Sequence, residues 1–142
     1  MPQRIMIVED DPMNAKLFQL VLTRKGNYAI EITEDPAHLI DQIKAGTVDL
    51  VIMDVSLSNS RLDGKSVDGL EITRRLKADP ATRGVPVLLA TAHAMKGSKE
   101  KFLKESGADG YISKPIVSAD ELLHQIELLI AKGSHAVPPA HR

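Results

Sequence analysis

The chain contains no cysteine among its 142 residues, no long hydrophobic run and no marked excess of charge of either sign. The absence of cysteine excludes a disulfide scaffold, thiol catalysis and a cysteine-based zinc site. The formal net charge is −1, with acids and bases spread along the chain. This argues against a nucleic-acid partner, because binding to the phosphate backbone needs a basic face. No apolar run approaches the roughly 20 residues that span a bilayer, so we expect no membrane partner.

The composition suits one soluble domain. Hydrophobic residues make up 43% of the chain, which is enough to bury a core without disulfides or metal. We expect the domain to cover residues 1–132 and the tail over 133–142, with its Pro138-Pro139 pair, to be disordered. The N-terminus opens directly into an apolar segment typical of a strand, so we expect no signal peptide and a cytoplasmic protein.

Short apolar segments alternate with amphipathic ones along the chain. Asp-Pro pairs at 11–12 and 35–36 predict helix caps, and Ser118 with Glu121 predicts a capping box. Strands are expected at 4–8, 28–32, 49–53, 85–90 and 110–112, and helices at 12–25, 36–45, 69–78, 94–106 and 119–132. Strict alternation implies parallel strands joined by right-handed crossovers. The predicted fold is therefore α/β, a doubly wound five-stranded parallel sheet with five helices on its two faces.

Three of the predicted helices carry an apolar stripe that we expect to face the sheet. The stripes are Met13, Leu17, Leu20 and Val21 in the first helix, Leu39, Ile40 and Ile43 in the second, and Leu122, Ile126 and Leu129 in the last. We expect Gly133 to end the last helix.

Acidic side chains stand at the carboxyl ends of two predicted strands. Glu9 and Asp10 follow the first strand, and Asp54 ends the third. The carboxyl ends of strands in such sheets form the edge where ligands bind. Clustered carboxylates repel one another unless a cation or a proton compensates them, and oxygen ligands suit Mg²⁺. The sequence therefore predicts a magnesium site at this edge.

A hydroxyl and an ammonium are predicted at the same edge, from Thr91 after the fourth strand and Lys114 after the fifth. Lys114 could pair with a phosphate group, and Thr91 could donate a hydrogen bond to it. Asp54 could then act as a nucleophile and form an acyl phosphate. Phosphoryl transfer depends mostly on positioning and charge neutralisation, and this set of groups supplies both.

Four motifs resemble the receiver domain of bacterial two-component response regulators, and they occur in that family's order. They are Ile7-Val8-Glu9-Asp10-Asp11, Met53-Asp54, Ala90-Thr91-Ala92 and Ser113-Lys114-Pro115. The resemblance covers about residues 3–132, and it implies a flavodoxin-like sheet with strand order 2-1-3-4-5. It further implies that Asp54 accepts phosphate from a sensor histidine kinase, so that the protein is a phosphoacceptor rather than a turnover enzyme.

The resemblance also implies how the remaining residues act. Asp10 and Asp54 would hold Mg²⁺ directly, with the carbonyl of Ser56 as a further ligand and Glu9 acting through water. Thr91 and Lys114 would contact the phosphoryl group. Phosphorylation would move Thr91 together with the switch residue Tyr111 and reshape the face formed by the fourth helix and fifth strand. The Lys114–Pro115 peptide would be cis.

We expect no output domain after the predicted receiver, so the chain resembles stand-alone regulators. Such proteins act by docking or by passing phosphate to a histidine phosphotransfer domain or a downstream response regulator. Residues 8–14 and 91–97 are the segments most similar to that subgroup. His93, two residues after Thr91, is expected near the site, either limiting water access or simply exposed.

The loop after Asp54 departs from the family pattern. Position 58 is Ser where the family usually has Pro, and the glycine that closes the loop occurs only at Gly69, so the loop is longer by about seven residues. A similar extension resembles some cyanobacterial single-domain regulators linked to phytochrome-class light sensing. It offers Arg61 and Lys65 as cations that could approach the site, although an adaptable surface loop is the simpler interpretation.

Two alternatives belong to other functional classes. A flavodoxin-like binder of a small molecule such as flavin mononucleotide needs a phosphate cradle rich in Ser, Thr and Gly after the first strand, where this chain has the acids at 9–11. Those acids would repel a phosphate unless a cation intervened. A degenerate receiver that serves only as a docking module would require the loss of a key residue, and none is lost.

Overall fold

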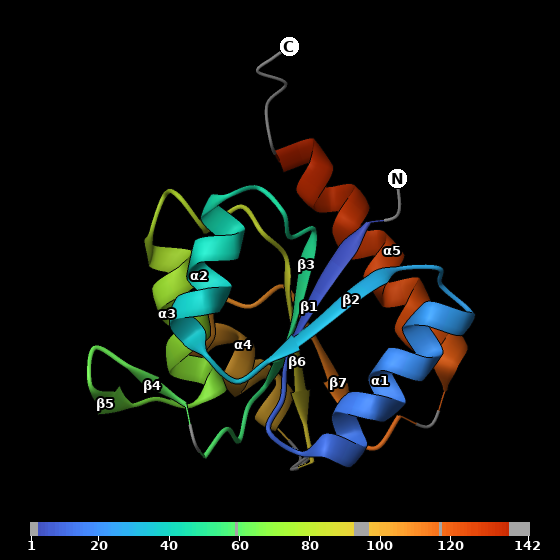
Figure 1. The fold of residues 1–142 in the computed structure, drawn as a ribbon, viewed down its shortest axis with the longest axis horizontal. Coiled ribbons are helices and arrows are strands. Elements are labelled where there is room, and N and C mark those ends of the chain that lie inside the picture. The colour runs from blue at the N-terminus through green and yellow to red at the C-terminus, as the bar shows by residue number, and fades with distance from the viewer. Residues whose placement is uncertain (1–2, 59, 93–96, 117, 137–142) are drawn as a thin grey trace.

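The computed structural model describes residues 3–58, 60–92, 97–116 and 118–136, and it contains a parallel sheet between two layers of helices (Figure 1). The sheet has five strands in the order β2-β1-β3-β6-β7, all paired in parallel. These strands are β1 (Arg4–Val8), β2 (Ala29–Thr33), β3 (Leu50–Asp54), β6 (Val87–Thr91) and β7 (Gly110–Ser113). The predicted doubly wound fold and its 2-1-3-4-5 order are thus confirmed.

Among the described residues, five helices cover the sheet, with α1 and α5 on one face and α2, α3 and α4 on the other (Figure 1). They are α1 (Pro12–Arg24), α2 (Pro36–Lys44), α3 (Gly69–Ala78), α4 (Ser98–Ser106) and α5 (Ala119–Ala136). Asp11 and Asp35 cap α1 and α2 as predicted, each accepting a hydrogen bond from a backbone N–H two residues on. None of the helices in the described ranges is long and apolar enough to cross a membrane.

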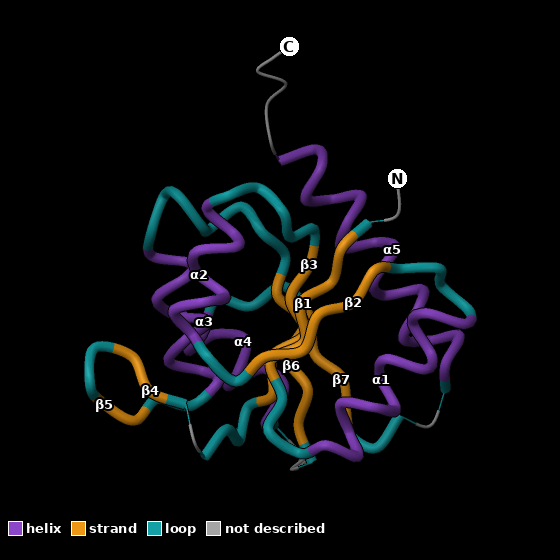
Figure 2. The backbone as a smooth tube through the Cα atoms, viewed as in Figure 1, coloured by secondary structure: helices purple, strands orange, loops and turns teal. Residues whose placement is uncertain are grey.

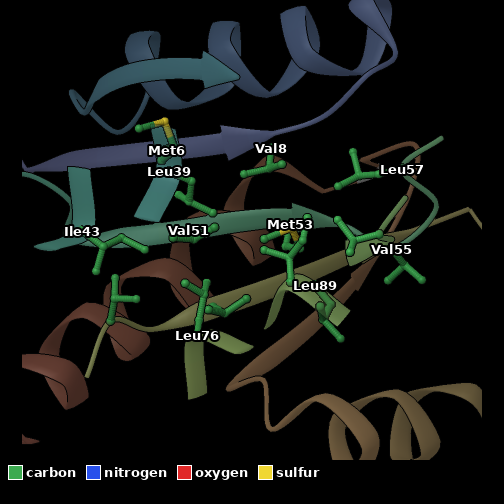
Figure 3. Close-up of a cluster of buried hydrophobic side chains, with 14 residues drawn as sticks. Met6, Val8, Leu39, Ile43, Val51, Met53, Val55, Leu57, Leu76 and Leu89 are labelled. Carbon is green, nitrogen blue, oxygen red and sulfur yellow. The ribbon is translucent and has the colours of Figure 1, made fainter. Parts of the chain in front are cut away.

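Alternate residues of the central strands supply two separate cores, as expected for strands buried on both faces. Ile5 and Ile7 of β1 face the α1 and α5 layer, whereas Met6 and Val8 face the α2, α3 and α4 layer. Figure 3 shows the second core, in which Val51 and Met53 of β3 lie beside Leu89 of β6. Because both cores are apolar, the charged side chains of the central strands β1, β3 and β6 are confined to the strand ends.

The buried face of α1 differs from the prediction. Met13 is 81% exposed, and Leu17 and Leu20 are also exposed. The helix instead buries a second face that carries Phe18 and Leu22. Both faces of α1 are apolar, so periodicity alone does not choose between them, and the aromatic ring of Phe18 packs into the core formed with β1.

The predicted stripes of the other two helices are largely confirmed. Leu39 and Ile43 of α2 are buried, and Ile40 packs partly against the same core. In α5, the core takes Leu122, Ile126 and Ile130, while Leu129 is only partly buried.

The end predicted for α5 is wrong, because the helix continues through Gly133 to Ala136. A glycine inside a helix costs about 1 kcal/mol relative to alanine, which weakens a helix without ending it. Residues 137–142 lie outside the described residues, so the domain boundary at 132 and the disorder of the tail stay predictions.

The long loop after β3 contains a short hairpin that the sequence analysis missed. Strand β4 (Arg61–Leu62) pairs antiparallel with β5 (Lys65–Ser66). The turn residues Asp63 and Gly64 both have positive φ, 55° and 79°, as a two-residue type I′ turn requires. The Asp-Gly pair was the signal available in the sequence. The Arg61 guanidinium donates to Gly64 O within the hairpin, and the hairpin projects outward beside α3 (Figure 1), which favours the interpretation of an adaptable surface loop.

Two leucines of α5 provide a matched test of the core. Leu122 is 2% exposed and Leu128 is 57% exposed. We expect Leu122→Ala to lower the free energy of unfolding by about 2–5 kcal/mol, because it leaves a cavity beside Ile126. Leu128→Ala should change it by less than about 0.5 kcal/mol. Urea denaturation followed by circular dichroism measures both, and equal losses would contradict this packing of α5.

Candidate functional site

Asp54 lies at the carboxyl end of β3, along the edge where β1, β6 and β7 also end (Figure 2). Asp54 is only 3% exposed, although it is an acidic residue at the end of an otherwise apolar strand. Its Oδ1 atom accepts a hydrogen bond from the backbone N–H of Ser56, at 3.1 Å, and another from the ammonium of Lys114, at 3.0 Å. The carboxylate is therefore held in one orientation from two sides.

The ammonium of Lys114 bridges two carboxylates. Its Nζ atom lies 2.9 Å from Glu9 Oε1 and 3.0 Å from Asp54 Oδ1, and all three side chains are at most 7% exposed. Burial lowers the pKa of Lys114, but the hydrogen bonds to Glu9 and Asp54 outweigh burial and hold the pKa above its usual value. Lys114 therefore remains a cation at neutral pH and ties β7 to β1 and β3.

Glu9 lies in the least favourable environment for a negative charge. Burial raises its pKa to about 7, helped by the nearby Asp54 carboxylate and opposed by hydrogen bonds from Lys114 and the Asp11 N–H. At neutral pH, Glu9 is therefore close to the midpoint of its titration. The site holds more negative charge than Lys114 compensates.

Asp10 is held by the loop that follows β3. Its Oδ2 atom accepts hydrogen bonds from the backbone N–H of Ser58, at 2.9 Å, and from the Ser58 hydroxyl, at 2.8 Å. Partial burial opposes ionisation of Asp10, but these two hydrogen bonds outweigh it and hold the pKa below its usual value. Asp10 is thus an ionised, oriented carboxylate beside Asp54.

The acidic residues fit a divalent cation. One oxygen from each of Glu9, Asp10 and Asp54 lies within 4.8 Å of the other two. When all groups are ionised, three carboxylates face the single ammonium of Lys114, which leaves two negative charges to compensate. Oxygen donors at such spacing are the ligands that Mg²⁺ prefers.

Thr91 ends β6 and is fully buried. In the register of the sheet, Asp54 pairs with Ala90, so Thr91 lies one position beyond the level of Asp54. Its carbonyl accepts a hydrogen bond from the Lys114 N–H, at 2.8 Å, and the Lys114–Pro115 peptide is cis, as expected. His93, expected nearby, lies outside the described residues.

Tyr111 lies on β7 with its ring packed toward α4. Its ring centroid is 6.3 Å from that of Phe102, and burial raises the pKa of the phenol. The hydroxyl is buried and, among the described residues, has no hydrogen-bond partner.

Gly69, the first residue of α3, closes the loop against the backbone of Asp54. A Cβ atom at this position would lie 2.0 Å from the Asp54 carbonyl oxygen. The Gly69 N–H also donates to Val55 O, at 3.2 Å. Only glycine allows the helix to start so close to the site, so α3 fixes the position of Asp54.

Sequence comparison identifies the family of this chain. A model of the response regulator receiver domain matches residues 5–127. The chain belongs to this family. The receiver domain is similar to the polar-differentiation response regulator DivK of Brucella anthropi, with 39% identity over 116 residues, which are 82% of this chain and 87% of DivK.

Solved structures share the fold of this receiver domain. The receiver domain of a sensor histidine kinase from Pseudomonas aeruginosa PAO1 has a TM-score of 0.75 and 26% identity, covering 92% of this chain and 99% of that one. That structure was determined with a magnesium ion coordinated in its active site cleft. A sensor protein from Polaromonas sp. JS666 has a TM-score of 0.75 and 25% identity, over 92% of this chain and 98% of its own.

Two glycines test how tightly α3 contacts Asp54. Gly69→Ala should lower the free energy of unfolding by about 1–3 kcal/mol, because its methyl group overlaps the Asp54 carbonyl. At Gly84 a Cβ atom would meet nothing within 4 Å, so Gly84→Ala should be neutral or stabilise by up to about 1 kcal/mol. Urea titrations measure both values. A Gly69→Ala protein as stable as the parent would contradict the contact.

Proposed function

We propose that this receiver domain takes a phosphoryl group onto Asp54 from a phosphohistidine of a sensor histidine kinase, with Mg²⁺ as cofactor. The observation that carries the proposal is the Lys114 ammonium 3.0 Å from the Asp54 carboxylate, in a cluster with two further acids. A flavodoxin-like binder is disfavoured by the same geometry, since Glu9 and Asp10 occupy the place of a phosphate cradle.

The reaction would be a transfer between two nucleophiles. An oxygen of Asp54 forms a bond to phosphorus while the phosphorus–nitrogen bond of the donor histidine breaks, and the electron pair of that bond stays on the imidazole. Lys114 would pair with a phosphoryl oxygen, and Thr91 would donate its hydroxyl to another. The domain accepts one phosphoryl group rather than turning over a substrate.

Three groups are proposed to hold the cation besides Asp54. Asp10 would bind it directly, the carbonyl of Ser56 would be a further ligand, and Glu9 would act through water. When bound, the cation would neutralise charge on the transferring phosphoryl group. The environment of Glu9 supports this, because burial and the nearby Asp54 carboxylate raise its pKa to about 7 despite the hydrogen bond from Lys114.

The output would be a change in a partner-binding face. Tyr111 lines a pocket of about 340 Å³ between α4, β7 and α5, together with Lys99, Ile116 and Glu121. We propose that Thr91 moves toward the phosphoryl group and that Tyr111 then leaves its present position, in which its hydroxyl lacks a partner among the described residues. A histidine phosphotransfer protein or a downstream response regulator would bind the altered face.

The input partner is proposed to dock on α1. This helix begins directly after Asp10 and Asp11, and Met13, Leu17 and Leu20 form an exposed apolar strip along it at helical spacing. A contiguous apolar strip beside a reactive site is typical of a protein-docking surface. The helical domain that carries the phosphohistidine is the partner that such a strip suits.

Phosphorylation of Asp54 is tested with a small donor. In acetyl phosphate and Mg²⁺ the parent chain should gain the mass of one phosphoryl group, measured by intact-mass spectrometry, and Asp54→Ala should gain none. Lys114→Ala should be labelled much more slowly, because the ammonium that contacts Asp54 is lost. A protein with Asp54→Ala that is labelled as fully as the parent would overturn the assignment.

The docking strip is tested with two leucines. Leu17→Glu should slow transfer from the sensor histidine kinase that phosphorylates the parent fastest, by about tenfold or more, because it places a charge in the proposed apolar contact. Leu128→Glu, on α5, is the matched control and should not change that rate. Labelling by acetyl phosphate should be the same in all three proteins. If Leu17→Glu slows the small donor equally, the effect is not on docking.

A further inference from the structure

The long loop after Asp54 is attached to the rest of the domain at several points. Leu57 and Val67 are buried in the core beneath α2 and α3, and Leu62 packs partly against it. Ser60 is buried, and its hydroxyl donates to Glu34 O, at 2.6 Å, while Val67 N–H donates to Ser60 O. These contacts hold the described part of the extended loop, residues 56–58 and 60–68, without involving the acidic site.

Ser58 makes a different kind of contact, because it reaches the acidic site itself. Both of its donors, the N–H and the hydroxyl, bind the same oxygen of Asp10, Oδ2, across 48 positions of sequence. This chain has serine at position 58, where the family pattern described above usually has proline. Proline has neither an N–H nor a hydroxyl, so it could not make this contact with Asp10.

We propose that Ser58 is a positioning residue for the metal site: it fixes the Asp10 carboxylate so that its other oxygen faces the cation together with Asp54 and Glu9. This inference rests on the proposed function and deepens it. It makes the loop after Asp54 part of the cation-binding apparatus.

The physical reasoning follows from the geometry of a carboxylate. Two hydrogen bonds on Oδ2 fix the rotation of the Asp10 side chain, and Oδ1 is the oxygen they leave for a ligand. A carboxylate that is already oriented loses less rotational freedom when it binds a cation. Residues that orient metal ligands in this way typically change metal affinity by about 10–100-fold when removed. Ser58→Ala keeps the N–H, so the lower end of that range is expected.

The extended loop offers a matched pair of serines for the experiment. Ser58→Ala removes the hydroxyl that binds Asp10, and Ser60→Ala removes a hydroxyl that anchors the same loop elsewhere. Ser58→Thr retains a hydroxyl at position 58. Asp10→Ala identifies the site, because saturable binding there should disappear. Each unphosphorylated protein is titrated with MgCl₂, and the dissociation constant is read from amide NMR shifts, with a thermal melt as a check on folding.

We expect Ser58→Ala to bind Mg²⁺ about tenfold more weakly, with Ser58→Thr and Ser60→Ala close to the parent and all melts similar. Equal or tighter binding by Ser58→Ala would overturn the proposal, since Ser58 would then be neutral or a competitor of the cation. Equal weakening by Ser60→Ala would overturn it too, because general loosening of the loop would explain the loss. If Ser58→Thr were as weak as Ser58→Ala, the hydroxyl would not be the cause.

The same titration separates this proposal from the proposed function. If the parent binds Mg²⁺ and Ser58→Ala binds it equally well, only the role of Ser58 fails. If the parent itself binds no Mg²⁺, the proposed function fails and the role of Ser58 fails with it.

Discussion

The site depends on one buried ammonium that contacts two of its three carboxylates. Lys114 is 7% exposed and contacts both Glu9 and Asp54, so it joins the first, third and last strands of the sheet at their carboxyl ends. Removing it would leave buried acids without a partner, which costs far more than the loss of a surface ion pair. When Glu9, Asp10 and Asp54 are all ionised, their three negative charges exceed the one positive charge of Lys114, and this imbalance supports the proposal that the site takes a cation.

The apolar sheet makes this imbalance possible. The strands β1, β3 and β6 are buried along their whole length except at the first residue of β1, so they tolerate charge only where they end. The parallel arrangement brings those ends to one edge, and the loops after them then meet there. Strands hold Asp54 and Thr91, while loops supply Asp10, Ser56 and Ser58. Groups from strands and groups from loops therefore meet at a single edge.

The sequence predicted most of this arrangement because the signals were local. Apolar runs ending in Glu9, Asp54 and Thr91 identify the strand ends, and Asp-Pro caps identify the helix starts. What it missed depends on tertiary packing. The packing of Phe18 into the core determines which face of α1 is buried. The contact between Ser58 and Asp10 joins residues 48 positions apart, which no periodicity reveals. The hairpin was the one omission with a local signal, the Asp63-Gly64 pair.

The close contact of Gly69 with Asp54 has a consequence for the length of the loop between them. The extended loop leaves the sheet at Asp54 and returns to the same residue at Gly69, so it is a closed loop whose two ends are already fixed together. The entropy of closing a loop grows only with the logarithm of its length, by about 0.6 kcal/mol for each doubling. A loop anchored in this way can therefore gain or lose residues at the hairpin tip with little effect on the stability of the domain or on the position of Asp54.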